Sequence, residues 1–161
     1  MRYRLAQTFL LIFLTSFLFK NTYGYEKALI FIDLNKTFIV ETAITEIQKK
    51  RGLMFREKFK NTNGMILIYK IPQIVTIWMK NTLMDLDIIF INNEKKIISI
   101  KHGKKLNIDL ISSQKPVIAV LEIPRNCSEK LGIKVNNKIN WKLVKNNQNF
   151  LSDKLDLLNC L

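Results

Sequence analysis

The chain has 161 residues and a formal net charge of +13 at pH 7, with 26 Lys and Arg against 13 Asp and Glu. Two cysteines and one histidine are too few for a structural zinc site, so we expect no bound metal. The lysines are scattered without interleaved aromatic residues, and no phosphate-binding or dinucleotide-binding glycine pattern occurs. This argues against nucleic acid as a partner and against a nucleotide cofactor, and we expect no cofactor.

The N-terminus has the pattern of an export signal. Arg2 and Arg4 precede an apolar run from Leu5 to Phe19, and small residues stand three and one before a cleavage point after Gly24. The run is shorter than the roughly 20 apolar residues of a membrane-spanning helix. We therefore predict a signal peptide over residues 1–24 and a protein of the periplasm or cell envelope. The alternative is an uncleaved anchor in the inner membrane, formed by residues 5–19.

Removal of the signal leaves 137 residues with a charge of about +10, one domain by length. Its first elements are a hairpin of two β-branched and aromatic runs, residues 28–33 and 37–42. Thr45 then opens a helix, because its hydroxyl and the Gln48 side chain three residues on form a capping box. Gly52 suits the left-handed position that closes such a helix.

Further strands are predicted at 64–69, 74–80, 87–92, 96–101, 116–123 and 138–144. Segment 74–80 is largely apolar on both faces, which indicates a central strand. Asn92-Asn93 suits a tight turn, residues 102–114 are interpreted as a loop, and a helical turn starts at Asn126 or Ser128 and ends at Gly132. The fold class is therefore mostly β: a compact antiparallel β-sandwich or barrel, jelly-roll-like, with one or two short helices.

Residues 25–145 are thus expected to form a single β-rich domain, and residues 146–161 a C-terminal tail. Leu151, Leu155 and Leu158 lie on one helical face of the tail, which fits a helix docked on the domain or one that binds a partner. In an oxidising compartment Cys127 could pair with Cys160 near the chain end, and this pairing stays open.

Several motifs occur in a characteristic order. They are Arg51–Arg56, Gly64–Ile66, Trp78–Thr82, Leu86–Ile91, Val120–Ile123 and Leu131–Val135. In this order the sequence resembles, over residues 38–140, the exported bacterial and archaeal family called domain of unknown function 192. The resemblance implies a compact β-sandwich or barrel of jelly-roll type with a short helix behind a signal peptide, and no established reaction. Asp85 stands where that family usually has proline.

Polar residues gather where strand 74–80 ends and the next one begins. If these strands are neighbours, Lys80, Asn81 and Asp87 meet at one end of the sheet, with Lys80 and Asp87 as an ion pair. Glu122 shares a strand face with apolar residues, so its carboxylate should be partly buried and need a partner. Arg51 and Arg56, at the end of the first helix, are the candidates.

These six residues, Arg51, Arg56, Lys80, Asn81, Asp87 and Glu122, admit two interpretations. They form a small ligand-binding pocket, or they pair off to tie the helix and loops to the sheet. His102 is interpreted as a solvated loop residue without a partner. The favoured function is an exported, non-catalytic envelope domain that binds an anionic small molecule or a protein partner. The alternative is a hydrolase- or lyase-like enzyme that uses Asp87 or Glu122 with Lys80.

Overall fold

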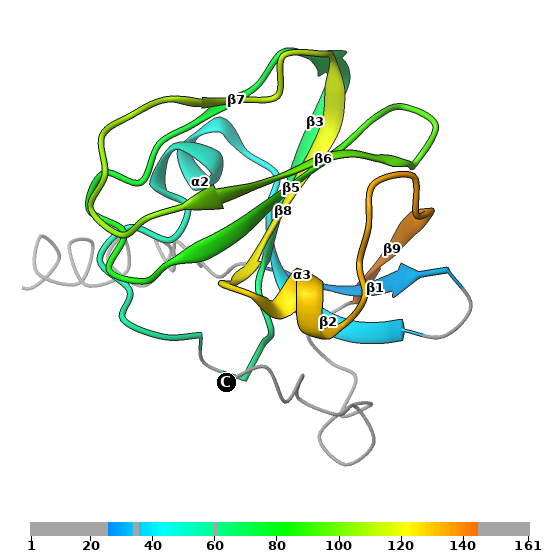
Figure 1. Cartoon of the computed structure of the whole chain (residues 1–161), viewed down its shortest axis with the longest axis horizontal. Helices are drawn as coiled ribbons and strands as arrows, with labels where there is room; N and C mark the ends of the chain where they lie inside the picture. The colour runs from blue at the N-terminus through cyan, green and yellow to red at the C-terminus, as the bar shows by residue number, and fades with distance from the viewer. Residues whose placement is uncertain (1–25, 34–35, 60, 145–161) are drawn as a thin grey trace, which may run out of the picture.

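The computed structural model describes residues 26–33, 36–59 and 61–144, which form a curved β-sheet with two short helices and a two-stranded ribbon (Figure 1). The helices are α2 (Glu46–Arg51) and α3 (Cys127–Lys130). The strands are β1 (Lys27–Ile32), β2 (Lys36–Ala43), β3 (Met65–Gln73), β4 (Thr76–Ile77), β5 (Leu86–Ile91), β6 (Ile97–Gly103), β7 (Ile111–Ser112), β8 (Val117–Pro124) and β9 (Ile139–Val144). The predicted mostly β class is confirmed.

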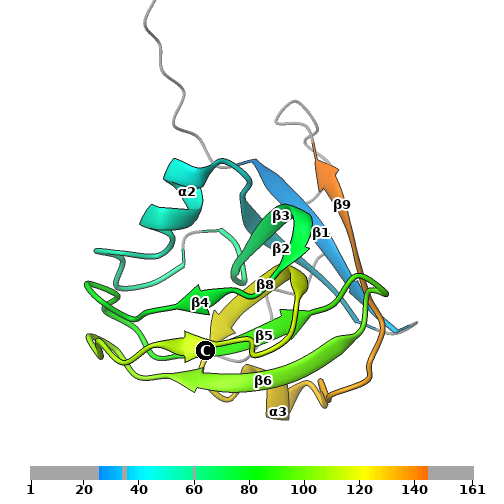
Figure 2. The same ribbon diagram turned by 90° about the horizontal axis from the view of Figure 1, so that it is seen from above.

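Seven strands form one sheet in the order β6-β5-β8-β3-β2-β1-β9, and β4 pairs with β7 in the ribbon. All sheet neighbours are antiparallel except β2 and β3, which run parallel because α2 and the segment after it carry the chain back between them. The sheet curls far enough for its two edges to touch at one corner. There Lys96 and Lys138 form an isolated bridge. The result is a half-barrel with α2 and α3 on opposite sides (Figure 2).

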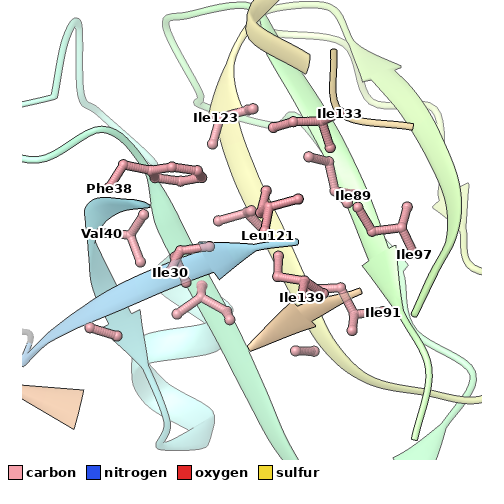
Figure 3. Packing of buried hydrophobic residues seen from close by; sticks show 14 of the residues in the cluster. Ile30, Phe38, Val40, Ile89, Ile91, Ile97, Leu121, Ile123, Ile133 and Ile139 are labelled. Carbon is pink, nitrogen blue, oxygen red and sulfur yellow. The ribbon is translucent and has the colours of Figure 1, made fainter. Parts of the chain in front are cut away.

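Each face of the curled sheet packs its own apolar cluster. The first fills the inside of the curl, where isoleucines of β1, β5 and β9 meet Phe38 and Leu121 (Figure 3). The second lies between the other face and the layer made by α2 and β4, and contains Met65, Ile88 and Met79. Strand β5 is buried along its whole length because it contributes side chains to both clusters.

The local chemistry that predicted α2 is confirmed. The Thr45 hydroxyl accepts the Gln48 backbone N–H at 3.2 Å, and the Gln48 side chain accepts the Thr45 N–H at 3.0 Å. Gly52 follows with a φ of 45°, and Gly132 follows α3 with a φ of 60°. The predicted hairpin is also confirmed as β1 and β2.

The prediction of a central strand at 74–80 is wrong. Only Thr76 and Ile77 form a strand, in the ribbon with β7 rather than in the sheet. One face of the segment packs on the second cluster through Val75, Ile77 and Met79, while the other carries Ile74 and Trp78 to the surface. Apolar residues also occur at protein surfaces. The sequence pattern therefore could not distinguish a segment that is buried on both faces from one that is buried on a single face.

Two smaller predictions also need correction. The segment expected to be a loop, residues 102–114, contains the end of β6 and all of β7. The turn between β5 and β6 exists, but its left-handed residue is Lys95, with a φ of 62°, rather than an asparagine. Asn92 instead shapes this turn with its side chain, whose Oδ1 accepts the N–H groups of Glu94 and Lys96.

The predicted signal peptide, the C-terminal tail and Cys160 lie outside the described residues. Cys127 is buried at the start of α3. Within residues 26–33, 36–59 and 61–144, no helix has the length and apolar character needed to cross a membrane.

Replacing Gly132 with alanine (G132A) is expected to lower the free energy of unfolding by about 1 kcal/mol, because its φ of 60° disfavours any Cβ. An added Cβ would meet no atom within 4 Å, so the cost comes from the backbone alone. Urea unfolding measures it, with Glu129→Ala on α3 as the control. An unchanged stability for G132A would show that α3 does not end in a left-handed turn.

Candidate functional site

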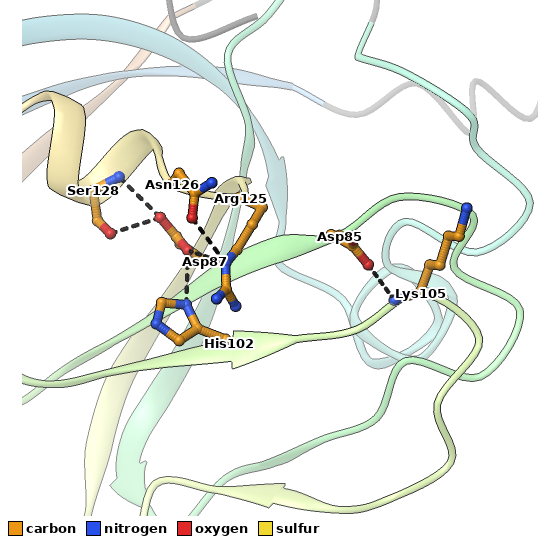
Figure 4. Close-up of polar contacts among 7 residues, drawn as sticks. All are labelled: Asp85, Asp87, His102, Lys105, Arg125, Asn126 and Ser128. Carbon is orange, nitrogen blue, oxygen red and sulfur yellow. Dashed lines mark hydrogen bonds and ion pairs between the residues drawn. The ribbon is translucent and has the colours of Figure 1, made fainter.

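Asp87 lies at the centre of a polar cluster where β5 begins, and its side chain is fully buried (Figure 4). Ser128 donates two hydrogen bonds to its Oδ2, one from the backbone N–H at 2.9 Å and one from the hydroxyl at 2.6 Å. His102 Nδ1 lies 3.0 Å from Oδ1, and Arg125 Nε lies 4.0 Å from it. The carboxylate therefore ties α3 to strands β5 and β6.

The hydrogen bonds decide the charge of Asp87. Burial by itself would raise the pKa of the carboxyl, but the donors on Ser128, Asn126 and His102 hold the pKa below its usual value. An ionised carboxylate only accepts, so His102 donates from Nδ1 and its Nε2 is left for solvent. The interpretation of His102 as a loop residue without a partner is wrong, since it lies on β6 and binds Asp87.

The predicted Lys80–Asp87 pair is wrong. The Lys80 side chain is exposed, and its Nζ lies 5.3 Å from the centre of the Trp78 ring. No ion pair joins Lys80 to a carboxylate in the described part of the chain. Asn81 contributes backbone instead: it has a φ of 59°, and its carbonyl accepts the Phe55 N–H at 2.7 Å.

Arg56 has a structural partner other than the one predicted. Its Nη1 lies 2.7 Å from Glu41 Oε1, and the Thr62 hydroxyl lies 3.5 Å from the same oxygen. The pair ties the segment after α2 to strand β2, and both side chains are largely covered. Arg56 thus has the structural role of one of the two interpretations, in which charged residues tie the helix and loops to the sheet. Its partner is Glu41, whereas the sequence suggested Glu122.

A pocket of about 280 Å³ opens between α2, β4 and the sheet. Its wall along α2 carries the basic residues Lys49, Lys50 and Arg51. Tyr69 and Trp78 supply aromatic surface, and buried apolar side chains of the second cluster complete the lining. Of the six predicted site residues, the structure places Arg51 and Glu122 in this pocket.

Glu122 lies in the C-terminal half of β8 and points to the pocket side of the sheet, between Met65 on β3 and Ile88 on β5. It is only 5% exposed. In the described residues, no hydrogen bond or ion pair reaches its carboxyl group. Burial raises the pKa of Glu122 to about 7, so the group changes its protonation near neutral pH.

Tyr69 and Lys49 complete the electrostatics around Glu122. Burial raises the pKa of the Tyr69 hydroxyl above its usual range, and the negative charges of Glu122 and Glu46 raise it further. The phenol therefore stays a neutral hydrogen-bond donor. Lys49 is already engaged, since its Nζ lies 2.6 Å from Glu46 Oε1 and 4.4 Å from the centre of the Tyr69 ring.

Asp87 and Glu122 cannot act on one substrate. Asp87 pairs across the sheet with Ile123, and Ile88 pairs with Glu122, so the two carboxylates project from opposite faces. The predicted single group of six is therefore split. One carboxylate is fully satisfied inside the curl, and the other lies in the pocket under α2.

The family pattern of DUF192, described as Uncharacterized ACR, COG1430, matches residues 29–141. The chain belongs to the DUF192 family. The solved structures that are similar to this DUF192 chain include the following two. A protein of Sinorhizobium meliloti 1021, named a "putative transcription regulator", shares 28% identity, with a TM-score of 0.66 over 74% of this chain and 95% of its own. A protein of unknown function from Novosphingobium aromaticivorans DSM 12444 shares 29% identity, with a TM-score of 0.68 over 75% and 89%. No curated protein matches.

Three residues of interest have roles that the sequence interpretation assigned differently or did not assign. The predicted central strand over residues 74–80 would bury Trp78, yet this side chain is 41% exposed and lines the pocket. Tyr69 lies on the same face of β3 as Met65 and Leu67, the face that packs the second cluster, and this spacing could have placed its polar tip in the pocket. Ser128, a partner of Asp87, lies 41 residues away in the sequence, and no local pattern links the two.

Proposed function

We propose that this DUF192 protein is an exported, non-catalytic domain of the cell envelope that binds a small anionic molecule in the pocket under α2. The observation that carries the proposal is the basic wall of that pocket. Lys50 and Arg51 line it, and in the described ranges neither side chain has an ion pair or hydrogen bond to a carboxylate. A guanidinium group with free donors is suited to bidentate binding of a carboxylate or phosphate.

The size and lining of the pocket support a small ligand. A volume of about 280 Å³ lies just below the range of about 300–1,000 Å³ for drug-sized ligands, which suits a smaller molecule. Apolar and aromatic side chains share the lining with many polar and charged groups, which come mainly from α2. The N-terminal signal pattern of residues 1–24 supports a place outside the cytoplasm, where the ligand would be a solute of the envelope.

The geometry argues against the enzyme alternative, because Lys80 does not lie beside either carboxylate. This alternative required Lys80 beside Asp87 or Glu122, but Lys80 lies over Trp78 and does not line the pocket. Glu122 remains as an acidic group with a pKa near neutrality, which is the range a general acid or base requires. Anion binding by Lys50 and Arg51 needs no catalytic group and does not depend on Glu122.

Changing Arg51 to glutamine (R51Q) is expected to weaken the binding of small carboxylates by about tenfold or more, because a charge-assisted hydrogen bond is lost. Isothermal titration of the chain from residue 25 onward, with a panel of mono- and dicarboxylates and inorganic phosphate, measures the affinity. Lys142→Gln on the edge strand β9 removes the same charge far from the pocket and should leave the affinity unchanged. Equal losses in both variants would indicate unspecific attraction to a basic protein. The absence of any binding would refute the proposal.

A further inference from the structure

Glu122 is the residue of the pocket that the anionic-ligand proposal leaves unexplained. Its carboxyl group is buried beneath α2 in the middle of the sheet, and its strand neighbours on that face, Met65 and Ile88, are apolar. In the described part of the chain no donor or cation pairs with it, whereas the other buried acid of the sheet, Asp87, has a complete set of partners. Burying a carboxyl group without a partner costs free energy that an apolar side chain would avoid.

The two ends of the pocket favour opposite charges. At the wall, Lys50 and Arg51 attract an anionic group. At the base, the Glu122 carboxylate would repel that same group and would instead stabilise a cation. The aromatic rings of Tyr69 and Trp78 line the same space, and ring faces also favour a cation. The Lys49 ammonium group lies over the Tyr69 ring and forms an ion pair with Glu46. It therefore does not neutralise Glu122.

We propose that the ligand of this pocket is a small zwitterion, whose protonated amine pairs with Glu122 while its carboxylate binds Arg51 and Lys50. This inference rests on the proposed function and names its ligand class. A pocket of about 280 Å³ has the scale of a single amino acid rather than of a long peptide. The amine supplies the charge partner that Glu122 lacks among the described residues.

The protonation of Glu122 gives the proposal a second signature. Its pKa of about 7 means that the carboxyl group ionises between mildly acidic and mildly basic pH, and an ammonium group binds the ionised form. The other titratable and charged groups that line the pocket are Tyr69 on β3 and Glu46, Lys49, Lys50 and Arg51 on α2. Zwitterion binding should therefore tighten as the pH rises through neutrality, and it should release a proton.

Isothermal titration at about pH 8 tests the inference with the standard amino acids, each beside the carboxylic acid that lacks its amine and the amine that lacks its carboxylate. For the amino acid that binds best, we expect an affinity about tenfold or more above that of its deaminated acid. Glu122→Gln (E122Q) should abolish this difference without weakening the acid. R51Q should weaken both compounds.

The outcomes separate this inference from the proposed function. If the deaminated acid binds as tightly as the amino acid, or if E122Q leaves the preference intact, the zwitterion is excluded and anion binding stands. If neither compound binds, both proposals fail. E122Q keeps the size of the side chain and removes only the charge, and urea unfolding of the variant confirms that any lost binding does not come from a lost fold.

Discussion

Replacing Asp87 with asparagine (D87N) is expected to lower the free energy of unfolding by about 3 to 5 kcal/mol, because the change breaks a buried charged network. The carboxylate accepts both hydrogen bonds from Ser128 and holds His102 at 3.0 Å. An amide presents one oxygen and one NH₂ group, so at least one of these donors would face another donor. Urea unfolding at neutral pH measures the loss.

Asp85→Asn is the matched control for D87N. Asp85 lies two residues away but is exposed, and its Oδ1 accepts one backbone N–H, from Lys105 at 2.7 Å. Its replacement should change stability far less. Lys80→Met should likewise have a small effect and should be additive with D87N, since the two side chains share no contact. If the effects of the two substitutions on stability were strongly coupled, Asp87 would contact Lys80 in solution, in contradiction to the contacts with His102, Ser128 and Arg125 described above.

The pH dependence of this network has a definite sign. The pKa of Asp87 is lower in the folded state than its usual value, so the unfolded chain binds the proton more readily. The stabilisation is therefore complete above the usual pKa of an aspartate and is lost as the pH falls through the folded-state pKa. In D87N this part of the acid sensitivity should disappear.

Replacing Glu122 with glutamine (E122Q) is expected to raise the free energy of unfolding by about 3 kcal/mol at about pH 8. The folded-state pKa of about 7 lies above the usual value of 4.5, and each tenfold difference in acidity constant corresponds to about 1.4 kcal/mol. Between these two values the folded state holds a proton that the unfolded chain has released. The stability of the natural protein therefore falls as the pH rises through this window, and E122Q avoids that loss.

Urea unfolding of E122Q and the natural protein at about pH 4 and about pH 8 checks this prediction. The gain should be present at the higher pH and absent at the lower one, where Glu122 is protonated in both states. Glu94→Gln, in an exposed pair with Lys96, serves as the control and should show no such pH dependence. A destabilised E122Q at about pH 8 would show that the carboxylate has a partner in solution.

The sequence predicted best those features whose chemistry is local. The capping box at Thr45 and Gln48 joins residues three apart, and the hairpin of β1 and β2 joins two adjacent strands. For the same reason, the long apolar runs that became β5 and β8 could be assigned as strands. The β-rich class follows from these features together.

The features that the sequence did not reveal depend on distant contacts. The parallel pairing of β2 with β3 depends on the path of the chain through α2, which no strand pattern encodes. The partners of Asp87 are His102, Arg125 and Ser128, which lie far from it in the sequence. Lys80 lies close to it in the sequence and was therefore the partner that the pattern predicted. The buried position of Glu122 was predictable from its apolar neighbours on β8. The pocket beside it was not, because predicting it requires knowing where α2 packs on the sheet.

The pairing of β1 with β9 places the two ends of the described chain side by side, with Lys27 opposite Val144. Contacts between residues so far apart in sequence slow folding, because a long loop must close before they form. While residues 139–144 are still inside the ribosome during synthesis, β9 cannot pair with β1. The half-barrel then lacks this edge strand. Strand β9, the last strand in the described part of the chain, completes the sheet, so we expect native folding of the described domain to wait until β9 has emerged.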